Sequence, residues 1–190
     1  IMAGAGVGTS GATVAIGVKE NNYLGKGIGL DANLTLTEDS IKGLFSVKNP
    51  NFKNSDKSIS ASVQATELNK LTDFGYKSSK TGFSIGTEFE YYEDLNFGIG
   101  FNTFYESLEA DTTASARQKK QAGNYFDIFT NLTFAYDKRD QKFQTTDGFL
   151  SRYNINLPLI SDSNTLTNTY TYSNYFQYLE KNIFKSSIYI

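Results

Sequence analysis

The 190-residue sequence predicts an all-β fold, an antiparallel up-and-down transmembrane β-barrel. Three observations support this prediction. Apolar and polar residues alternate with a period of two along most of the chain, as in strands whose two faces meet different surroundings. The alternating segments run for about ten residues or more, which suits a tilted strand crossing a bilayer better than the usual soluble strand. Tyr and Phe gather at strand ends on the apolar face, where barrels carry aromatic girdles.

The first alternating segments lie in the N-terminal third of the chain. Residues 2–8 alternate small apolar residues with glycines, and residues 13–19 place Val and Ile opposite Thr, Ala, Gly and Lys. Residues 28–36 and 59–65 continue the pattern, with Leu, Ile, Val and Ala opposite Gly, Asp, Asn, Ser and Gln. Each segment therefore predicts one strand with a single apolar face.

The second half of the chain carries the longest alternating segments. They cover residues 81–91, 95–105, 125–136 and 149–159, and Phe, Ile, Leu and Tyr line one face of each. Their aromatic ends include Tyr91, Tyr105, Tyr136 and Phe149. Counted along the whole chain, the pattern predicts about ten strands and an eleventh that begins near Ile183.

The composition excludes several classes of function. The chain has no His and no Cys, so it lacks the commonest general base, the thiolate nucleophile and the usual zinc ligands. The formal net charge is −2, which gives no basic field for nucleic acid. We expect no catalytic residues, no metal site, no cofactor and no nucleic-acid partner.

The polar face separates a barrel from the main structural alternative, a soluble β-sandwich used for binding. In a sandwich one face of each sheet also packs in a core. Here the second face consists of Gly, Ser, Thr, Asn and Glu, which suits a water-filled lumen. Buried in a dry core, each of these polar side chains would need a hydrogen-bond partner.

A dense charged segment, AYDKRDQKFQTTDGF at residues 135–149, separates two alternating segments. Its carboxylates are spaced too irregularly for a calcium loop, and no His accompanies them. Asp147 and Gly148 predict a tight turn, because Gly takes positive φ without strain. We expect Asp137, Arg139 and Asp140 to pair across that turn and keep it in water.

Other charged groups can be interpreted either as binding groups or simply as solvated surface charge. Glu88 and Glu90 share the polar face and could form an acid pair or bind a cation, but solvated lumen charge is the simpler interpretation. The longest predicted loops cover residues 67–79 and 106–122, on the same side of the membrane. The second loop contains Arg117, Lys119 and Lys120, which could contact anionic lipopolysaccharide or remain solvated.

Three turn motifs resemble those of the BamA and TamA superfamily of outer-membrane protein assembly factors. The residues that match the first motif are Asn22, Tyr23, Leu24, Gly25 and Gly27. The second is matched by Asn49, Pro50 and Phe52. The third is matched by Tyr136, Asp137, Arg139, Asp140, Thr146, Asp147 and Gly148. Thr145 stands where the family has Pro, and we expect it to loosen the third turn.

The resemblance covers essentially the whole chain. It implies that residues 1–190 are a partial barrel domain, with roughly ten to eleven of about sixteen strands. The periplasmic POTRA domains, the C-terminal strands and the family's Val-Arg-Gly-Phe loop are missing from the segment, which we therefore interpret as a fragment. The implied location is the bacterial outer membrane, with a multi-pass arrangement and the three motif turns at the periplasmic interface.

The implied function is to fold and insert nascent β-barrel proteins through a lateral gate, without covalent chemistry. In the family the first strand opens at its edge and pairs with an incoming strand, which is β-augmentation. The residues that match this edge are Met2, Ala3, Gly4, Ala5, Gly6, Val7 and Gly8. The implied partners are nascent outer-membrane barrel proteins, accessory assembly lipoproteins, and outer-membrane lipids or lipopolysaccharide.

The residues alone leave alternatives open at this strand and for the chain. A glycine-rich strand also curves or lets backbones pack closely, with no gating role. The barrel could be a passive porin or transporter, or a polypeptide-secretion barrel of the same superfamily. The segment alone does not distinguish BamA from TamA.

Overall fold

The sheet is continuous and follows the order of the sequence. The structure, a computed structural model, describes residues 1–8, 11–161, 165–179 and 182–190. Eleven strands form one sheet, and each strand pairs antiparallel with the next. This confirms the predicted up-and-down arrangement and the predicted eleventh strand, whereas a β-sandwich would need a second sheet packed on the first.

The strands lengthen toward the middle of the chain and shorten again at the end. Their bounds are β1 (Met2–Gly8), β2 (Gly11–Tyr23), β3 (Ile28–Thr37), β4 (Ser40–Asn49), β5 (Ser58–Lys70), β6 (Tyr76–Tyr92), β7 (Leu95–Ala110), β8 (Gly123–Asp137), β9 (Gly148–Ile160), β10 (Thr167–Leu179) and β11 (Asn182–Tyr189). Short helical turns interrupt three connections: η1 (Phe52–Asn54), α1 (Leu71–Phe74) and α2 (Ala116–Gln121).

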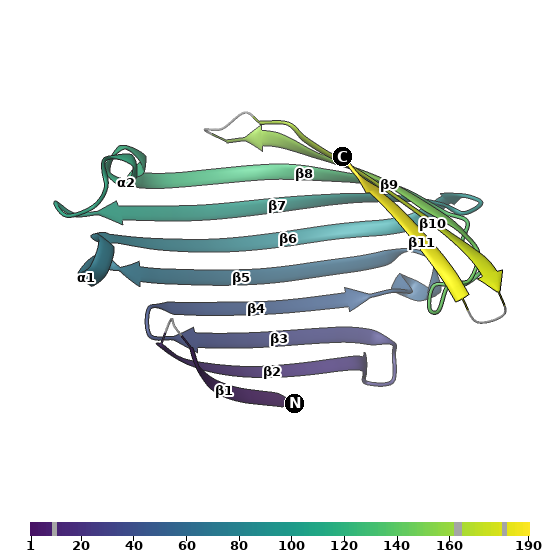
Figure 1. Cartoon of the computed structure of the whole chain (residues 1–190), viewed down its shortest axis with the longest axis horizontal. Coiled ribbons are helices and arrows are strands. Elements are labelled where there is room, and N and C mark those ends of the chain that lie inside the picture. Colours follow the sequence, from purple (N-terminus) through teal and green to yellow (C-terminus); the bar gives the residue numbers. More distant parts are fainter. Residues whose placement is uncertain (9–10, 162–164, 180–181) are drawn as a thin grey trace.

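The sheet curls strongly but does not close. In Figure 1 strands β9 to β11 bend over the hollow side of the central strands. Among the described residues, β1 and β11 each pair with one neighbour only, so each leaves an edge of the sheet free. The curl separates a convex, outward face from a concave, inward face, which is the geometry of a barrel wall.

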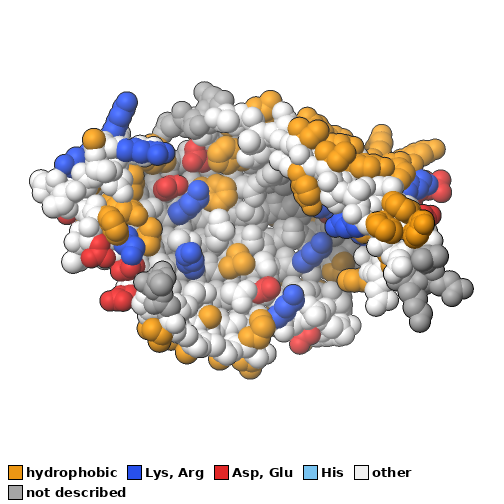
Figure 2. All heavy atoms as spheres, in the orientation of Figure 1, with side chains coloured by type: hydrophobic (Ala, Val, Ile, Leu, Met, Phe, Trp, Pro, Cys, Tyr) orange, Lys and Arg blue, Asp and Glu red, His pale blue; other side chains and the backbone are white. Residues whose placement is uncertain are grey.

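The strand register places the apolar alternation on one face throughout. Phe97 lies opposite Phe134, and Ile99 opposite Leu132, all on the outward face. The inward face carries small and polar residues, and Asn102 donates a hydrogen bond there to Asn131. Figure 2 shows charged side chains of both signs scattered over the hollowed face. The two faces therefore differ as lipid and water differ.

The apolar side chains of this sheet do not form a dry core. Within the described ranges, the buried apolar side chains are Ala114 and Ala135. Outward rings and aliphatic chains stay open, as with Phe45, which is 49% exposed, and Ile16, which is 50% exposed. An apolar face of this size, with no protein layer on it in the described part of the chain, is suited to contact with hydrocarbon.

The two longest predicted loops are shorter than expected, because strand pairing continues into them. The predicted loop at residues 67–79 is mostly strand: β5 and β6 stay paired out to Lys70 and Tyr76, and only α1 and Gly75 connect them. The predicted loop at residues 106–122 loses its first residues to β7, which ends at Ala110. These extensions carry polar residues on both faces, so the alternation that predicts strands is absent although the backbone pairs.

The helical turns are short: α1 and α2 lie at one end of the strands, and η1 lies in the β4–β5 connection at the other end (Figure 1). In α2, Ser115 and Gln118 form a reciprocal capping box that fixes the first turn of the helix. In the part of the chain that the structure describes, no helix has both the length and the apolarity to cross a membrane.

Candidate functional site: the first strand and the motif turns

The first strand is short and pairs on one side only. It lies antiparallel to β2, with Ala3 opposite Ile16 and Ala5 opposite Val14. This register turns Ala3, Ala5 and Val7 to the outward face and the alternate residues inward. The other edge of β1 has no partner strand among the described residues, so its N–H and C=O groups form an open template for another strand.

Close packing does not account for the glycines of β1. A Cβ added to Gly4 or Gly6 would meet nothing within 4 Å in the described structure. Glycines that do bear close neighbours lie elsewhere, as at Gly82, whose added Cβ would contact the Phe104 ring at 2.6 Å. Gly4 and Gly6 therefore lower the strand's own stability, because Gly has the largest backbone entropy to lose on ordering.

The first motif turn joins β2 to β3 and is held by one asparagine. Asn22 Oδ1 accepts a hydrogen bond from the backbone N–H of Gly27 at 2.6 Å, and Asn22 O accepts one from Gly25 at 3.0 Å. Leu24, Gly25 and Gly27 all have positive φ, between 56° and 70°. The asparagine and the glycines of this motif are thus needed to reverse the chain, and Tyr23 ends β2 just before the reversal.

The second motif turn joins β4 to β5. Asn49 Oδ1 accepts a hydrogen bond from the N–H of Asn51 at 3.2 Å, which makes an Asx turn around Pro50. The N–H of Phe52 then donates to Lys57 O at 2.8 Å and closes the loop.

The third motif turn joins β8 to β9 and has the densest bonding. The guanidinium of Arg139 donates two hydrogen bonds to the carboxylate of Asp137, each 2.7 Å long, and both side chains are 16% exposed. Two parallel bonds of this kind fix the orientation of both groups. The pair lies on the inward face at the end of β8, since Asp137 shares its face with Ala135.

Asp140 has a different role from the expected cross-turn ion pair. Its carboxylate accepts hydrogen bonds from the Thr146 hydroxyl at 2.6 Å and from the backbone N–H groups of Thr146 and Asp147. The Thr146 hydroxyl first, and then the N–H groups, lower the pKa of Asp140 below its usual value. The Asp140 carboxylate therefore closes the loop through its own hydrogen bonds. The ion pair of Arg139 is with Asp137 and not with Asp140.

Gly148 and Thr145 each meet a specific structural requirement of the third motif turn. Gly148 has a φ of 97°, and a Cβ there would overlap the backbone carbonyl of Lys138. Thr145, at the position of the family's Pro, is buried, and its hydroxyl donates to Gln141 O at 2.8 Å. This hydrogen bond restrains the loop where we expected the loss of Pro to loosen it.

Some of the contacts at this end of the sheet could not be predicted from the sequence. Lys138 forms an ion pair with Asp94 in the turn between β6 and β7, and Asp94 O accepts the N–H of Asp137 at 2.9 Å. The carboxylate of Asp94 raises the pKa of Lys138. Tyr175 of β10 interacts with Arg139 and helps to raise its pKa, after the larger effect of Asp137. Only strand register brings these residues together.

The three motif turns lie at the same end of the sheet (Figure 1). The β2–β3, β4–β5 and β8–β9 connections all join an even strand to an odd one, so an up-and-down sheet puts them on one edge. The inward acid pair of the sequence does not form a shared site, because Glu90 Oε1 accepts the N–H of Asp94 at 2.8 Å instead. No group of three or more His, Cys, Asp or Glu in the described residues could hold a metal ion.

Comparison with known proteins places this architecture in a family. Residues 22–188 match the model of the Omp85 superfamily domain, which is most of the chain. The chain belongs to the Omp85 superfamily. The match includes all three motif turns, and the Omp85 family indicates an outer-membrane location for this barrel.

A solved structure shows the same fold. The crystal structure of BamA from Haemophilus ducreyi lacking POTRA domains 1–3 matches this Omp85 chain with a TM-score of 0.65 and 18% sequence identity. The match covers 94% of the chain and 37% of that structure, so the chain spans little more than a third of its length. At this identity the likeness establishes the fold, a BamA-like barrel fragment of eleven strands.

Proposed function

We propose that this Omp85 chain is the N-terminal part of the barrel domain of an outer-membrane assembly factor. The factor folds and inserts nascent β-barrel proteins at the first strand of its barrel. The mechanism is β-augmentation. A terminal strand of the client pairs with the free edge of β1, main-chain hydrogen bonds hold it, and no covalent step is needed. The proposed partners are nascent barrel proteins, outer-membrane lipids and accessory lipoproteins.

The observation that carries this proposal is the construction of β1. Its free edge is continuous from Met2 to Gly8, and Gly4 and Gly6 have open space around them. A strand with little packing opens and re-pairs at low cost, which a gate requires. By contrast, β6 has 17 residues and is paired on both sides.

The outward apolar band supports a second part of the proposal, local disturbance of the bilayer beside the gate. On β7 the band runs from Leu95 to Tyr105, whereas on β4 it runs only from Ile41 to Val47. On β2 it ends at Val18, because the next outward residue is Glu20. A narrower apolar band near the first strand favours a locally thinner bilayer, which eases insertion of a client.

Site-specific photo-crosslinking tests the proposed gate. In the full-length protein, a photoreactive amino acid at Ala3, Ala5 or Val7 should crosslink to the terminal strand of a stalled client barrel. The same amino acid at Phe101, outward on the distant β7, is the matched control and should give no client crosslink. If several clients fail to crosslink at all three β1 positions, the gate proposal is wrong.

The same experiment separates the rival functions. A passive porin or transporter barrel would give no client crosslinks from β1. A secretion barrel of the superfamily would crosslink its passenger from inward positions such as Asn102 or Asn131, which line the concave face. Crosslinks from the β1 edge without lumen crosslinks favour the assembly factor.

A further inference from the structure

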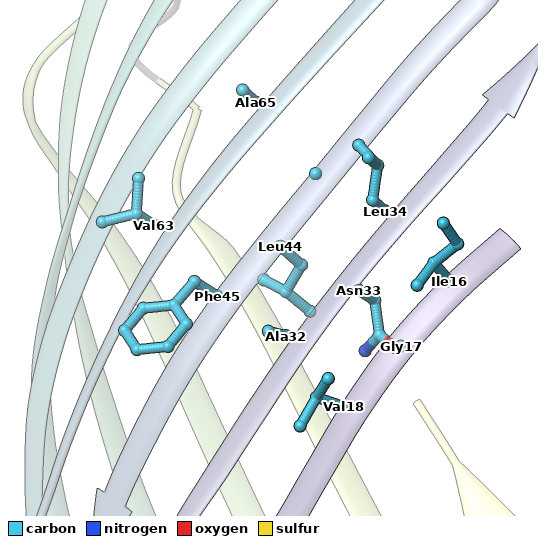
Figure 3. A pocket seen from close by; sticks show the side chains of 11 residues that line it. Ile16, Gly17, Val18, Ala32, Asn33, Leu34, Leu44, Phe45, Val63 and Ala65 are labelled. Atoms are coloured by element: carbon cyan, nitrogen blue, oxygen red, sulfur yellow. The ribbon is translucent and has the colours of Figure 1, made fainter. Parts of the chain in front are cut away.

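An open apolar groove of about 410 Å³ crosses the outward face of β2–β5 (Figure 3). Small residues make its floor: Ala32, Gly43 and Ala65. Larger side chains border it, with Leu34 on one side and Phe45 and Val63 on the other (Figure 3). The register explains the hollow, because Leu34 lies opposite Gly43 and Gly43 lies opposite Ala65, which leaves two adjacent strands without a bulky side chain.

The groove lies inside the outward apolar band of these strands. Glu20 is the first outward charge on β2 toward the motif turns, and Glu67 is the first on β5 toward the opposite end. Glu67 is paired with Lys77 at 2.9 Å, which marks a polar boundary of the band. The groove residues fall between these charges, so hydrocarbon surrounds the groove when the barrel crosses the bilayer.

The outward face of β6–β8 is built from larger side chains. On β6–β8, the rings of Phe89, Phe97 and Phe134 contact one another, with centroids 5.8 Å and 5.2 Å apart. These rings cover the outward face near the start of β7, whereas alanine and glycine form the floor of the groove on β3–β5.

We propose that the groove holds one acyl chain of a membrane glycerophospholipid as an ordered ligand. An unfilled groove forfeits the dispersion contacts of every atom that lines it, and a flexible acyl chain restores them. The outward side chains that line the groove carry no polar group, so the chain and not the headgroup is what they recognise. The inference rests on the barrel crossing the bilayer, and it is independent of the client pairing proposed for β1.

The test is photolabelling by lipid. The full-length protein is reconstituted in vesicles of phosphatidylethanolamine and phosphatidylglycerol that contain a trace of phospholipid with a diazirine in the middle of one acyl chain. Labelled residues are mapped by mass spectrometry. We expect labelling of the groove to exceed labelling of outward β6–β8 residues by roughly threefold or more, because a chain with many packed contacts stays longer than bulk lipid.

Filling the groove supplies the decisive comparison. A Cβ added at Gly43 would come no closer than 4.0 Å to another atom, so Gly43→Leu fills the hollow without a backbone clash. It should abolish the excess labelling, and Ala65→Leu gives a second route to the same result if the first variant folds poorly. Thr87→Leu, outward on β6, is the matched control and should leave groove labelling unchanged.

Several outcomes would overturn the inference. Even labelling over the whole outward face, or excess labelling that survives Gly43→Leu and Ala65→Leu, excludes an ordered chain in the groove. Crosslinks from groove positions to client protein in place of lipid would assign the groove to a different occupant. Absence of lipid labelling anywhere on the barrel would contradict the bilayer-spanning arrangement itself, whereas failure of client crosslinking at β1 would leave the lipid result standing.

Discussion

The N-terminal strands and the central wall of this sheet are built from the same alternation but in different ways. Strands β1–β4 have 7 to 13 residues, small side chains on parts of both faces, and one free edge. Strands β6–β9 have 13 to 17 residues, outward aromatic rings in contact, and a turn closed by an ion pair and a bonded carboxylate. The difference indicates a rigid wall that supports a loosely held edge.

Glycine substitutions test this contrast with the largest expected effect. Gly148→Ala would force a Cβ into the Lys138 carbonyl at a positive φ, and should cost about 3 kcal/mol of unfolding free energy. Gly4→Ala, in the open space of β1, should instead raise the unfolding free energy by about 0.5–1 kcal/mol, because Ala has less backbone entropy to lose on ordering. Urea unfolding of the full-length barrel in vesicles measures both. Equal losses would remove the distinction between the two regions.

Aromatic truncation gives the next largest difference. Phe97 contacts the rings of Phe89 and Phe134, so Phe97→Ala should lose about 1–2 kcal/mol of stability from two aromatic pairs. Phe45 on β4 has no ring partner among the described residues, and Phe45→Ala should cost about 1 kcal/mol less than Phe97→Ala. The same unfolding experiment compares the two variants. A larger loss at Phe45 would contradict a more tightly packed central wall.

The ion pair at the β8–β9 turn should give a smaller effect. Arg139→Lys keeps the charge but cannot make both hydrogen bonds to Asp137, and should destabilise the barrel by about 1 kcal/mol. Lys26→Arg, in the β2–β3 turn at the same end of the sheet, is the reverse exchange at an exposed position and should have no measurable effect. Retention of full stability in Arg139→Lys would mean that the planar fork is dispensable.

The smallest expected effect is a pH dependence carried by Asp140. The folded-state pKa of Asp140 lies below the usual value of 3.8. The ionised carboxylate therefore makes its full contribution to stability at pH values above 3.8. The contribution is lost as the pH falls from 3.8 through the lower folded-state pKa, because the protonated carboxyl no longer accepts the bonds of Thr146 and Asp147. Asp140→Asn should flatten this part of the stability profile, measured by unfolding between pH 2 and pH 6. An unchanged profile would show that other groups cause it.

Part of the candidate site could be predicted from local sequence. The positive φ of Gly25 and Gly148 and the Asx turn at Asn49 depend on residues a few positions apart, so the motif turns are visible in the sequence. Other contacts join separate turns and strands. Arg139 interacts with Tyr175, and Lys138 forms an ion pair with Asp94. Such contacts depend on register and curl, for which a single strand carries no signal.

The sequence alone determined the fold class, the strand count and the polarity of each face, because alternation with a period of two is a local property of each strand. It did not determine where β6 and β7 end, since backbone pairing continues through polar residues that lack the pattern. Nor did it reveal the groove on β2–β5, whose floor residues come from three different strands. Tertiary structure decided these features, because only the register of neighbouring strands sets which small residues lie side by side.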